Sequence, residues 1–379
     1  MELKKNLINP SVRMDSTTQY NIVNITQNNN KQWNHLVEIT PANCIMQSFE
    51  WGEFKKNLGW KVYRLAVVHE EEIIAGAQLL IRSIFNGFFS IAYIPRGPIG
   101  QTGNDLILKQ LLLSIHKIAS KNRALFLKIE PPWEYGSIYH TQLKNLGFQP
   151  SLHTNQPKSS ILVDLTMKAD DLLLTFHKTT RYNIRYAIRN NVSIEEGNED
   201  DLKTFYRLLE ITAKRNSFPI RSFDYYLGEW KTFVTKGQAK IFLANHNNRT
   251  IAARIAFVYG RYGADFHGAF SGEKKNLKVN HLLVWEAMKW AQRAGCQTYD
   301  LWGIPDKAGE YHIRGLEIPK ELSGDLWGVY DFKRGFGGRI VCYLGAYDYP
   351  YYTKLYQLLV NQIFKRSSLE MIMKKFSVL

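Results

Sequence analysis

Residues 61–83 read KVYRLAVVHEEEIIAGAQLLIRS, and this stretch holds two apolar runs on either side of a charged turn. Valine, isoleucine, leucine and tyrosine are frequent in Lys61–His69 and Ile73–Ser83, as expected of strands. The three glutamates between the runs suit an exposed turn. A third apolar run follows at Phe88–Ile94. We therefore predict a meander of three antiparallel strands.

A helix and a fourth strand are predicted after the meander. Over residues 106–120, apolar side chains recur at the spacing of one helical face, at Leu108, Leu111, Ile115 and Ile118. Ala124–Ile129 is then a short apolar run of strand length, and two prolines follow shortly after it. This run is typical of a buried strand.

The same order of elements recurs in the second half of the chain. Ile251-Ala252-Ala253-Arg254 takes the place that Ile74-Ala75-Gly76-Ala77 holds in the first half. The elements predicted there are strands at Lys240–Asn245, Ile251–Tyr259 and Tyr262–Phe270, a helix at Val279–Ala294 and a strand at Thr298–Trp302. Three antiparallel strands, a helix and a strand form the order of the GNAT acyltransferase core. We therefore predict a mixed α/β (α+β) fold with two tandem GNAT-like acyltransferase domains.

Changes in composition suggest the domain boundaries. Residues 1–30 are polar and rich in asparagine, so we predict a loose N-terminal leader and no signal peptide. The first domain is predicted over residues 31–160, joined by the C-terminal segment 340–379, and the second over 161–339. The linker between them is placed at His153–Ser160, which is polar and contains a proline.

The overall composition is that of a globular protein with an anionic partner. The chain has 379 residues, 45% of them hydrophobic, which suits two domains with sizeable cores. Lysine and arginine outnumber the carboxylates 49 to 34, and this excess favours nucleic acid, a phosphorylated substrate or an acidic membrane surface over a neutral partner. The three cysteines and ten histidines are scattered, so we expect a reducing compartment, no disulfides and no metal site.

The loop that binds acetyl-CoA in GNAT enzymes is not recognisable in this chain. That loop has the pattern Q/R-x-x-G-x-G/A at the start of a helix, where backbone amides hold a pyrophosphate. The matching segment, Arg96-Gly97-Pro98-Ile99-Gly100, has isoleucine at the first required glycine. Gly268-Ala269-Phe270-Ser271-Gly272, in the second half, lacks the pattern as well. We predict an acyltransferase core without the usual cofactor site.

Five segments in order along the chain resemble the FemABX family of peptidoglycan bridge transferases. They are Gln47–Trp60, Ala92–Pro98, Thr180–Ala187, Asp300–Pro305 and Tyr330–Gly338. The resemblance covers nearly the whole chain. Many family members carry a coiled-coil arm in the second domain, whereas Asn198–Lys236 shows no sustained heptads, so the chain is similar to the short form without this arm.

The resemblance implies a cytoplasmic aminoacyltransferase that adds an amino acid to the stem peptide of a peptidoglycan precursor. Its donor would be aminoacyl-tRNA, with no other cofactor, and its acceptor a UDP-linked or lipid-linked muramyl peptide. We expect a monomer. Two alternatives remain: an N-acyltransferase with another acyl donor, acting on a polysaccharide or amine, and a non-catalytic relative that binds RNA or membrane.

A basic segment without carboxylates marks a candidate anion site. Residues 172–194 contain no Asp or Glu but hold Lys178, Arg181, Arg185 and Arg189 at the spacing of one helical stripe. Like charges at this spacing repel each other. A bound anion, either the diphosphate of the acceptor or the phosphates of tRNA, would remove this repulsion. The alternative is a solvated basic face. Tyr182 and Tyr186 lie beside the stripe, where they would contact the uridine or the peptide, or form only a half-buried shoulder.

Three further residues are candidates for substrate binding. Tyr93 and Arg96 belong to a stiff loop between a strand and a helix, with two prolines and a glycine. Arg96 has an alternative role, in a salt bridge that locks this loop. Lys55 is predicted on an early helix bounded by Gly59, and the resemblance implies a place near the nucleotide or diphosphate. The alternative is a solvated lysine on the helix surface.

The predicted catalytic residues are Phe332 and Lys333, just before Gly335, Gly337 and Gly338. The resemblance implies that Lys333 lies in the reaction centre, where a cation stabilises the oxyanion of an attacked ester. The alternative is a glycine-rich turn with an exposed lysine. For the general base the candidates by location are Asp265, Asp300 and Asp331, with the ribose hydroxyl of the tRNA as a further proton carrier.

The C-terminal stretch Tyr352–Phe376 has one apolar face and carries Lys365, Arg366, Lys374 and Lys375. Two roles are open to it: a closing helix packed on the first domain, or a helix that contacts the inner face of an acidic membrane.

Overall fold

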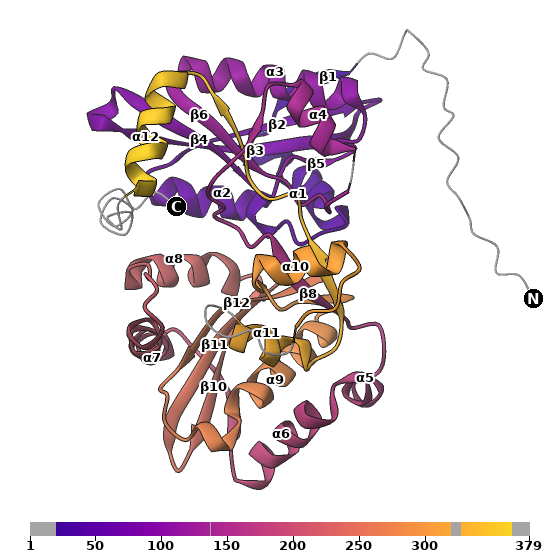
Figure 1. The fold of residues 1–379 in the computed structure, drawn as a ribbon, viewed down its shortest axis with the longest axis vertical. Coiled ribbons are helices and arrows are strands. Elements are labelled where there is room, and N and C mark those ends of the chain that lie inside the picture. Colours follow the sequence, from indigo (N-terminus) through magenta and orange to yellow (C-terminus); the bar gives the residue numbers. More distant parts are fainter. Residues whose placement is uncertain (1–19, 137, 320–326, 366–379) are drawn as a thin grey trace, which may run out of the picture.

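The structure is a computed structural model that describes residues 20–136, 138–319 and 327–365. It consists of two mixed β-sheets, one above the other in Figure 1, each covered by helices. The first half of the chain forms the upper part, the second half forms the lower part, and the C-terminal helix returns to the upper part. The predicted fold class, two tandem GNAT-like domains, is confirmed.

The first sheet has eight strands in the order β1-β2-β3-β4-β6-β15-β7, with β5 paired to β3. Its strands are β1 (Asn21–Asn24), β2 (Lys61–His69), β3 (Glu72–Ile84), β4 (Phe89–Pro95), β5 (Ile99–Gly100), β6 (Ala124–Glu130), β7 (Gln149–Pro150) and β15 (Tyr347–Pro350). Strands β2, β3 and β4 are antiparallel, whereas β4 and β6 are parallel and joined through α3. This is the predicted meander with its crossover helix.

The second sheet has seven strands in the order β14-β8-β13-β12-β11-β10-β9. Its strands are β8 (Ser159–Asp164), β9 (Ser193–Gly197), β10 (Ala239–His246), β11 (Arg249–Tyr259), β12 (Tyr262–Phe270), β13 (Thr298–Asp300) and β14 (Arg339–Cys342). Strands β10, β11 and β12 are antiparallel, and β12 runs parallel to β13. The second sheet therefore repeats the pairing of the first.

The helices are α1 (Asn30–Ile39), α2 (Phe49–Asn57), α3 (Asp105–Lys121), α4 (Tyr139–Asn145), α5 (Ala169–Thr175), α6 (Lys178–Arg189), α7 (Asp201–Asn216), α8 (Phe223–Val234), α9 (Val279–Arg293), α10 (Asp306–Ile313), α11 (Trp327–Arg334) and α12 (Thr353–Lys365). The crossover helices α3 and α9 match their predicted bounds within one residue. The segment predicted to lack a coiled-coil arm holds only α7 and α8.

Segments near both ends of the described part of the chain add strands to the first sheet. Strand β1 falls within the predicted leader and pairs antiparallel with β2, while residues 1–19 lie outside the described part. Near the other end, β14 pairs with β8 in the second sheet, and β15 then pairs with β6 and β7 in the first. Helix α12 packs on the first sheet through Tyr356, which is buried against Phe126. Of the basic residues named above for the C-terminal stretch, Arg366, Lys374 and Lys375 lie outside the described residues.

The two domains share one hydrophobic cluster. Trp33 of α1 and Phe54 of α2 belong to it together with Phe205 of α7 and Phe233 of α8. Helix α2 contacts α8 directly, and the Trp51 and Phe233 ring centroids are 6.4 Å apart. Because burial of such large side chains contributes roughly 1.5–3 kcal/mol each, this cluster holds the walls of the interdomain space in fixed positions.

One predicted strand ends earlier than expected. The strand predicted over Thr298–Trp302 stops at Asp300, because Trp302 and Gly303 take left-handed backbone conformations with φ of 52° and 79°. A non-glycine residue in this region is strained by about 1 kcal/mol or more. The turn directs Trp302 toward the other domain, where it becomes part of the pocket described next.

Candidate functional site

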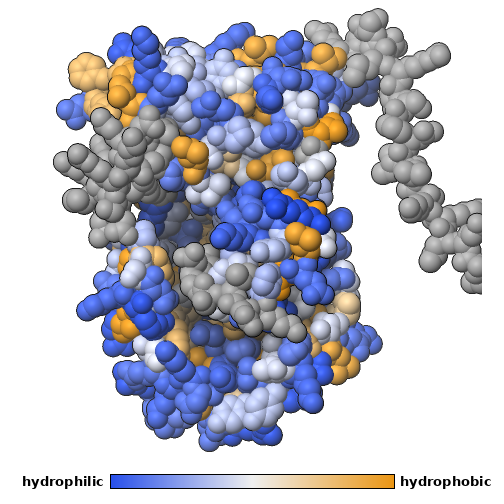
Figure 2. Space-filling model, viewed as in Figure 1, coloured by the Kyte–Doolittle hydropathy of each residue, from blue (hydrophilic) through white to orange (hydrophobic). Residues whose placement is uncertain are grey.

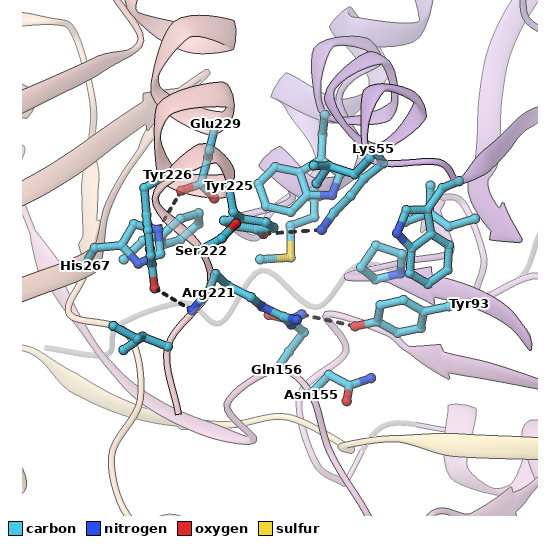
Figure 3. Close-up of a pocket in the computed structure, with 18 of the residues that line it drawn as sticks. Lys55, Tyr93, Asn155, Gln156, Arg221, Ser222, Tyr225, Tyr226, Glu229 and His267 are labelled. Atoms are coloured by element: carbon cyan, nitrogen blue, oxygen red, sulfur yellow. Dashed lines mark hydrogen bonds and ion pairs between the residues drawn. The ribbon is translucent and has the colours of Figure 1, made fainter. Parts of the chain in front are cut away.

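A pocket of about 790 Å³ lies between the two domains (Figure 3). Helix α2 and strands β3 and β4 supply one side, and α8, β12 and Trp302 supply the other. The lining residues are Met46, Trp51, Lys55, Leu58, Trp60, Leu80, Arg82, Tyr93, Pro95, Thr154, Asn155, Gln156, Pro219, Ile220, Arg221, Ser222, Tyr225, Tyr226, Glu229, Phe266, His267 and Trp302. Of the predicted site residues, Lys55 and Tyr93 are in this set.

The sequence around Gln47-Ser48 explains how α2 is placed. The Ser48 hydroxyl accepts a hydrogen bond from the Trp51 amide at 3.1 Å and so caps the start of the helix. Gln47 is fully buried, where its amide donates to the Pro95 carbonyl at 2.5 Å and its oxygen accepts from the Gln78 backbone at 2.7 Å. This residue therefore ties the start of α2 to the end of β4, and Lys55 lies in the last turn of the same helix.

Lys55 is a cation without a carboxylate partner among the described residues. Its Nζ lies 3.3 Å from the Tyr225 hydroxyl and about 5 Å from three rings, those of Trp51, Phe54 and Tyr225. The pKa of Lys55 is lowered to about 7, mainly by burial and also by the neighbouring Arg221 charge, while Glu229 opposes the change. A negatively charged ligand would stabilise the protonated form of a lysine in these surroundings.

Two arginines add positive charge to the same pocket. Arg82 comes from β3 and donates to the Leu58 carbonyl, with its guanidinium 5.9 Å from the Trp60 ring. Arg221 precedes α8 and lies over the Tyr225 ring at 5.5 Å. Among the described lining residues, the one carboxylate is Glu229, and it is bound to His267 Nε2 at 2.6 Å. The pocket therefore holds three cations and a carboxylate that already has a partner.

Polar groups from the predicted linker form another wall. The Tyr93 hydroxyl donates a hydrogen bond to the Glu130 carboxylate and accepts one from the side-chain amide of Gln156 at 3.1 Å. Glu130 also accepts from the backbone of Gln156 at 3.1 Å. Burial raises the pKa of both Tyr93 and Glu130. The segment predicted only as a linker is thus held in place at the pocket by a buried carboxylate.

Arg96 lies behind the pocket and is not among its lining residues. It is buried, with its guanidinium 4.8 Å from the Trp302 ring and 4.6 Å from the Tyr343 ring, and it donates to the Pro157 carbonyl at 3.1 Å. Its φ of 48° is strained, like that of Trp302 on the other side of the contact. The structure places Arg96 of the first domain between the rings of Trp302 and Tyr343.

Lys333 is buried next to the pocket wall. Its ammonium donates to the carbonyls of Trp302 and Gly303, the latter at 2.6 Å. Burial lowers the pKa of Lys333 to about 8, whereas the charges of Asp265 and Asp300 act in the opposite direction. The alternative prediction of an exposed lysine is wrong. Phe332 is half-buried, with its ring 4.8 Å from that of His281.

The three aspartates proposed as general base occupy different surroundings. Asp331 is exposed and pairs with Arg334 at 3.2 Å. Asp265 is buried in an ion pair with Arg254. Asp300 is buried too, accepts from Ser160 and from the Trp302 amide at 2.8 Å, and has its pKa raised by burial. None of the three lines the pocket.

The predicted residues of α6 lie elsewhere, on the surface of the second domain. Tyr182 is 55% exposed, Arg185 is exposed and Tyr186 is half-buried. Arg181 turns away from the stripe, because its guanidinium donates to the carbonyls of Leu174 and Phe176 at 2.9 and 2.5 Å. These carbonyls come at the end of α5, so Arg181 caps that helix and is not free on an open stripe.

Sequence reasoning missed Arg82, Arg221 and the Glu229–His267 pair. In the sequence, Arg82 can be recognised only as a polar residue within a predicted strand. Arg221 lies in a segment without a local motif. These residues come together through the packing of α8 on α2. In the described residues no group of His, Cys, Asp and Glu has the arrangement of a metal site. No helix in the described ranges is both long and apolar enough to span a bilayer.

Two sheets of this kind around a charged interdomain pocket define a tandem GNAT-like protein. A solved structure of FemX matches with a TM-score of 0.78 and 23% identity, over 90% of this chain and all of FemX. A tandem GNAT protein from the clavulanic acid biosynthesis pathway matches with a TM-score of 0.53 and 10% identity, over 87% of this chain and 98% of that protein. Both likenesses concern the fold.

The chain belongs to the FemAB family, whose model matches residues 28–257 and 235–363. Among its relatives is the lipid II:glycine glycyltransferase of Staphylococcus saprophyticus, 23% identical over 86% of this chain and 92% of the relative. The enzyme of the same name from Staphylococcus aureus (strain MRSA252) is 25% identical over 87% of this chain and 93% of the relative. The predicted family is confirmed, and the named relatives are enzymes of the predicted transferase class.

Proposed function

We propose that this protein transfers an amino acid from aminoacyl-tRNA to the stem peptide of a lipid-linked muramyl peptide. The observation that carries the proposal is the interdomain pocket, in which Lys55, Arg82 and Arg221 converge without a free carboxylate among the described lining residues. The relatives named for glycyl transfer to lipid II support the class of reaction and a lipid-linked acceptor.

The pocket cations bind the diphosphate of the acceptor. A diphosphate presents several charged oxygens, which suit two guanidinium groups and an ammonium in a partly dry space. Its charge raises the pKa of Lys55 again, because an anion stabilises the protonated form. The aromatic rings around Lys55 cover the apolar faces of the ligand, and the polar wall at Tyr93 and Gln156 supplies hydrogen bonds.

The reaction is an aminolysis. The neutral amine of the stem peptide attacks the ester carbonyl of the aminoacyl-tRNA, a C–N bond forms, and the C–O bond to the ribose breaks. The proton lost by the amine goes to the departing ribose oxygen, directly or through a water. The Lys333 ammonium, held by two carbonyls beside Trp302, stabilises the oxyanion of the tetrahedral intermediate.

Use of an acyl-CoA donor is not favoured by the arrangement at the end of β4. Ile99 and Gly100, at the position of the cofactor loop, form β5 and pair with Gly76 and Ala75 of β3. Their backbone groups are therefore engaged in a sheet and do not surround an open pyrophosphate site at the start of α3.

A transfer assay tests the proposal. The purified protein is incubated with tRNA charged with a radioactive amino acid and with either lipid II or UDP-muramyl-pentapeptide, and labelled acceptor is separated by chromatography. We expect transfer to lipid II with at least one charged tRNA, and slower transfer to the UDP-linked acceptor. Absence of transfer from every charged tRNA to both acceptors, with a staphylococcal glycyltransferase active in the same mixture, would contradict the proposal.

A further inference from the structure

The second domain carries a surface of basic side chains that is separate from the pocket. Helix α6 buries Thr180, Ile184 and Ala187 and exposes Lys178, Arg185 and Arg189. These three cations form no ion pair with any described carboxylate. Because like charges on one helical face repel each other, these three side chains lower the stability of the protein slightly when no anion is bound.

A second segment, distant in sequence, extends this surface. The 3-10 helix η4 (Lys275–Leu277) packs against α6, and Lys274, Lys275 and Lys278 around it are exposed without an ion pair in the described part of the chain. The nearby Glu273 is already bound to Arg249 at 3.0 Å. We call the six residues Lys178, Arg185, Arg189, Lys274, Lys275 and Lys278 the α6 surface. In Figure 2, the lower end of the molecule, where Figure 1 labels α6, is mainly hydrophilic.

The partner of the α6 surface is an extended polyanion and not the diphosphate of the pocket. None of the six residues lines the pocket. A membrane is disfavoured because a helix that lies on a bilayer needs a free apolar face, whereas the apolar face of α6 is buried in the core with Phe176 and Trp285. On α6, the exposed large apolar side chains are Tyr182 and Ile188. Arginines beside a tyrosine suit a nucleic-acid backbone.

The α6 surface begins next to the predicted reaction centre. At the start of α6, the His177 amide donates to the Gly335 carbonyl at 2.9 Å. Thr180 lies so close to Gly335 that an added Cβ there would come within 2.3 Å of its hydroxyl. Gly335 lies two residues after Lys333, just beyond the end of α11. The start of α6 is therefore joined to the end of α11, and the 12 residues of α6 extend over about 16 Å at 1.5 Å per residue.

We propose that the α6 surface binds the phosphate backbone of the double-helical acceptor stem of the donor RNA. The single-stranded end of the RNA, with its aminoacyl ester, then reaches Phe332 and Lys333. This inference rests on the proposed function for the ester chemistry, but the contact itself concerns only RNA binding. The contacts are to phosphates, so they do not depend on base sequence.

The test compares two triple variants with equal changes of charge. One carries Lys178→Glu, Arg185→Glu and Arg189→Glu. The control carries Lys109→Glu, Lys117→Glu and Lys144→Glu on α3 and α4, where all three lysines are exposed without a described ion pair and lie at the opposite end of the molecule (Figure 1). Binding of uncharged tRNA is measured by fluorescence anisotropy over a range of salt concentrations, and thermal unfolding shows that each variant is folded.

We expect the α6 variant to bind tRNA at least about tenfold more weakly and to lose about three from the slope of log K against log salt, one for each phosphate contact. The control should keep the wild-type slope. Equal loss in both variants, or no loss in the α6 variant, overturns the proposal. The proposal is also overturned if the α6 variant still binds tRNA but no longer sediments with phosphatidylglycerol vesicles.

A shortened donor separates this proposal from the proposed function. With an amino acid esterified to the terminal cytidine-adenosine dinucleotide, the α6 variant should transfer at the wild-type rate, since this donor has no stem. With full tRNA its KM should rise at least about tenfold. Equal loss with both donors overturns the α6 assignment. If the wild type transfers from neither donor but the variants differ in tRNA binding, the proposed function fails and the RNA-binding surface stands.

Discussion

The interdomain pocket and the α6 surface both gather cations, but they differ in burial. Lys55 lies among three rings beside two arginines, and burial shifts its pKa to about 7. Arg185 and Arg189 are exposed to water, where salt screens them. The buried cluster of the pocket suits one compact anion held in a single position. The exposed row on α6 suits a polyanion with regularly repeated charges, which it can bind in several positions.

The largest effect is expected at Lys333, where the proposal places a cation beside the reacting atoms. Replacement Lys333→Met removes the proposed oxyanion partner, so kcat should fall by about 100- to 1,000-fold with little change in the KM for the acceptor. Steady-state transfer measures this. The matched control is Arg334→Met, because Arg334 is its exposed neighbour and pairs with Asp331. A variant that keeps kcat while losing acceptor affinity would place Lys333 in binding instead.

A smaller loss, in acceptor binding, is expected from Lys55→Met. A charged hydrogen bond to phosphate contributes about 1.5–3 kcal/mol, so the Kd for UDP-muramyl-pentapeptide should rise about 10- to 100-fold in calorimetry. The control Lys56→Met changes the adjacent exposed lysine, which pairs with Glu53 at 2.8 Å, and should bind as the wild type does. Equal Kd values for the wild type and Lys55→Met would remove Lys55 from the diphosphate site.

The pH dependence of binding should distinguish the two clusters. Since the pKa of Lys55 in the free protein is about 7, the lysine loses its proton as the pH rises through this value, and binding of an anion must restore it. Acceptor affinity should therefore fall above pH 7, by up to about tenfold per pH unit, with proton uptake in calorimetry. Lys55→Arg should flatten this profile, because arginine stays charged. Binding of tRNA through the α6 surface should not change over the same range.

The smallest effect is expected from Tyr225→Phe. The change removes the hydroxyl 3.3 Å from the Lys55 ammonium but keeps the ring at 4.9 Å. We expect at most about 1 kcal/mol in acceptor binding, or less than about sixfold in Kd. If this variant binds as weakly as Lys55→Met, the hydroxyl and not the ammonium holds the ligand.

Some of the residues predicted from the sequence line the pocket, and others lie elsewhere. The family resemblance points to Lys55 and the stiff proline-containing loop to Tyr93, and both residues line the pocket. Helical spacing placed Arg181 on one stripe with Arg185, but spacing alone does not show that Arg181 is used to cap α5. Arg82, Arg221 and His267 have no local pattern that marks them, because the pocket joins segments far apart in the chain.

The sequence by itself determined the two repeated sheets, the crossover helices, the family and the altered cofactor loop. These depend on periodicity and on residues close together in the chain, which can be read locally. Only the tertiary structure decided which cations share a pocket, which remain in water, and that the predicted linker lines the site. The physical reason is that burial and ion pairing depend on the packing of α2 on α8 and of α6 on α9, and these contacts join residues distant in sequence.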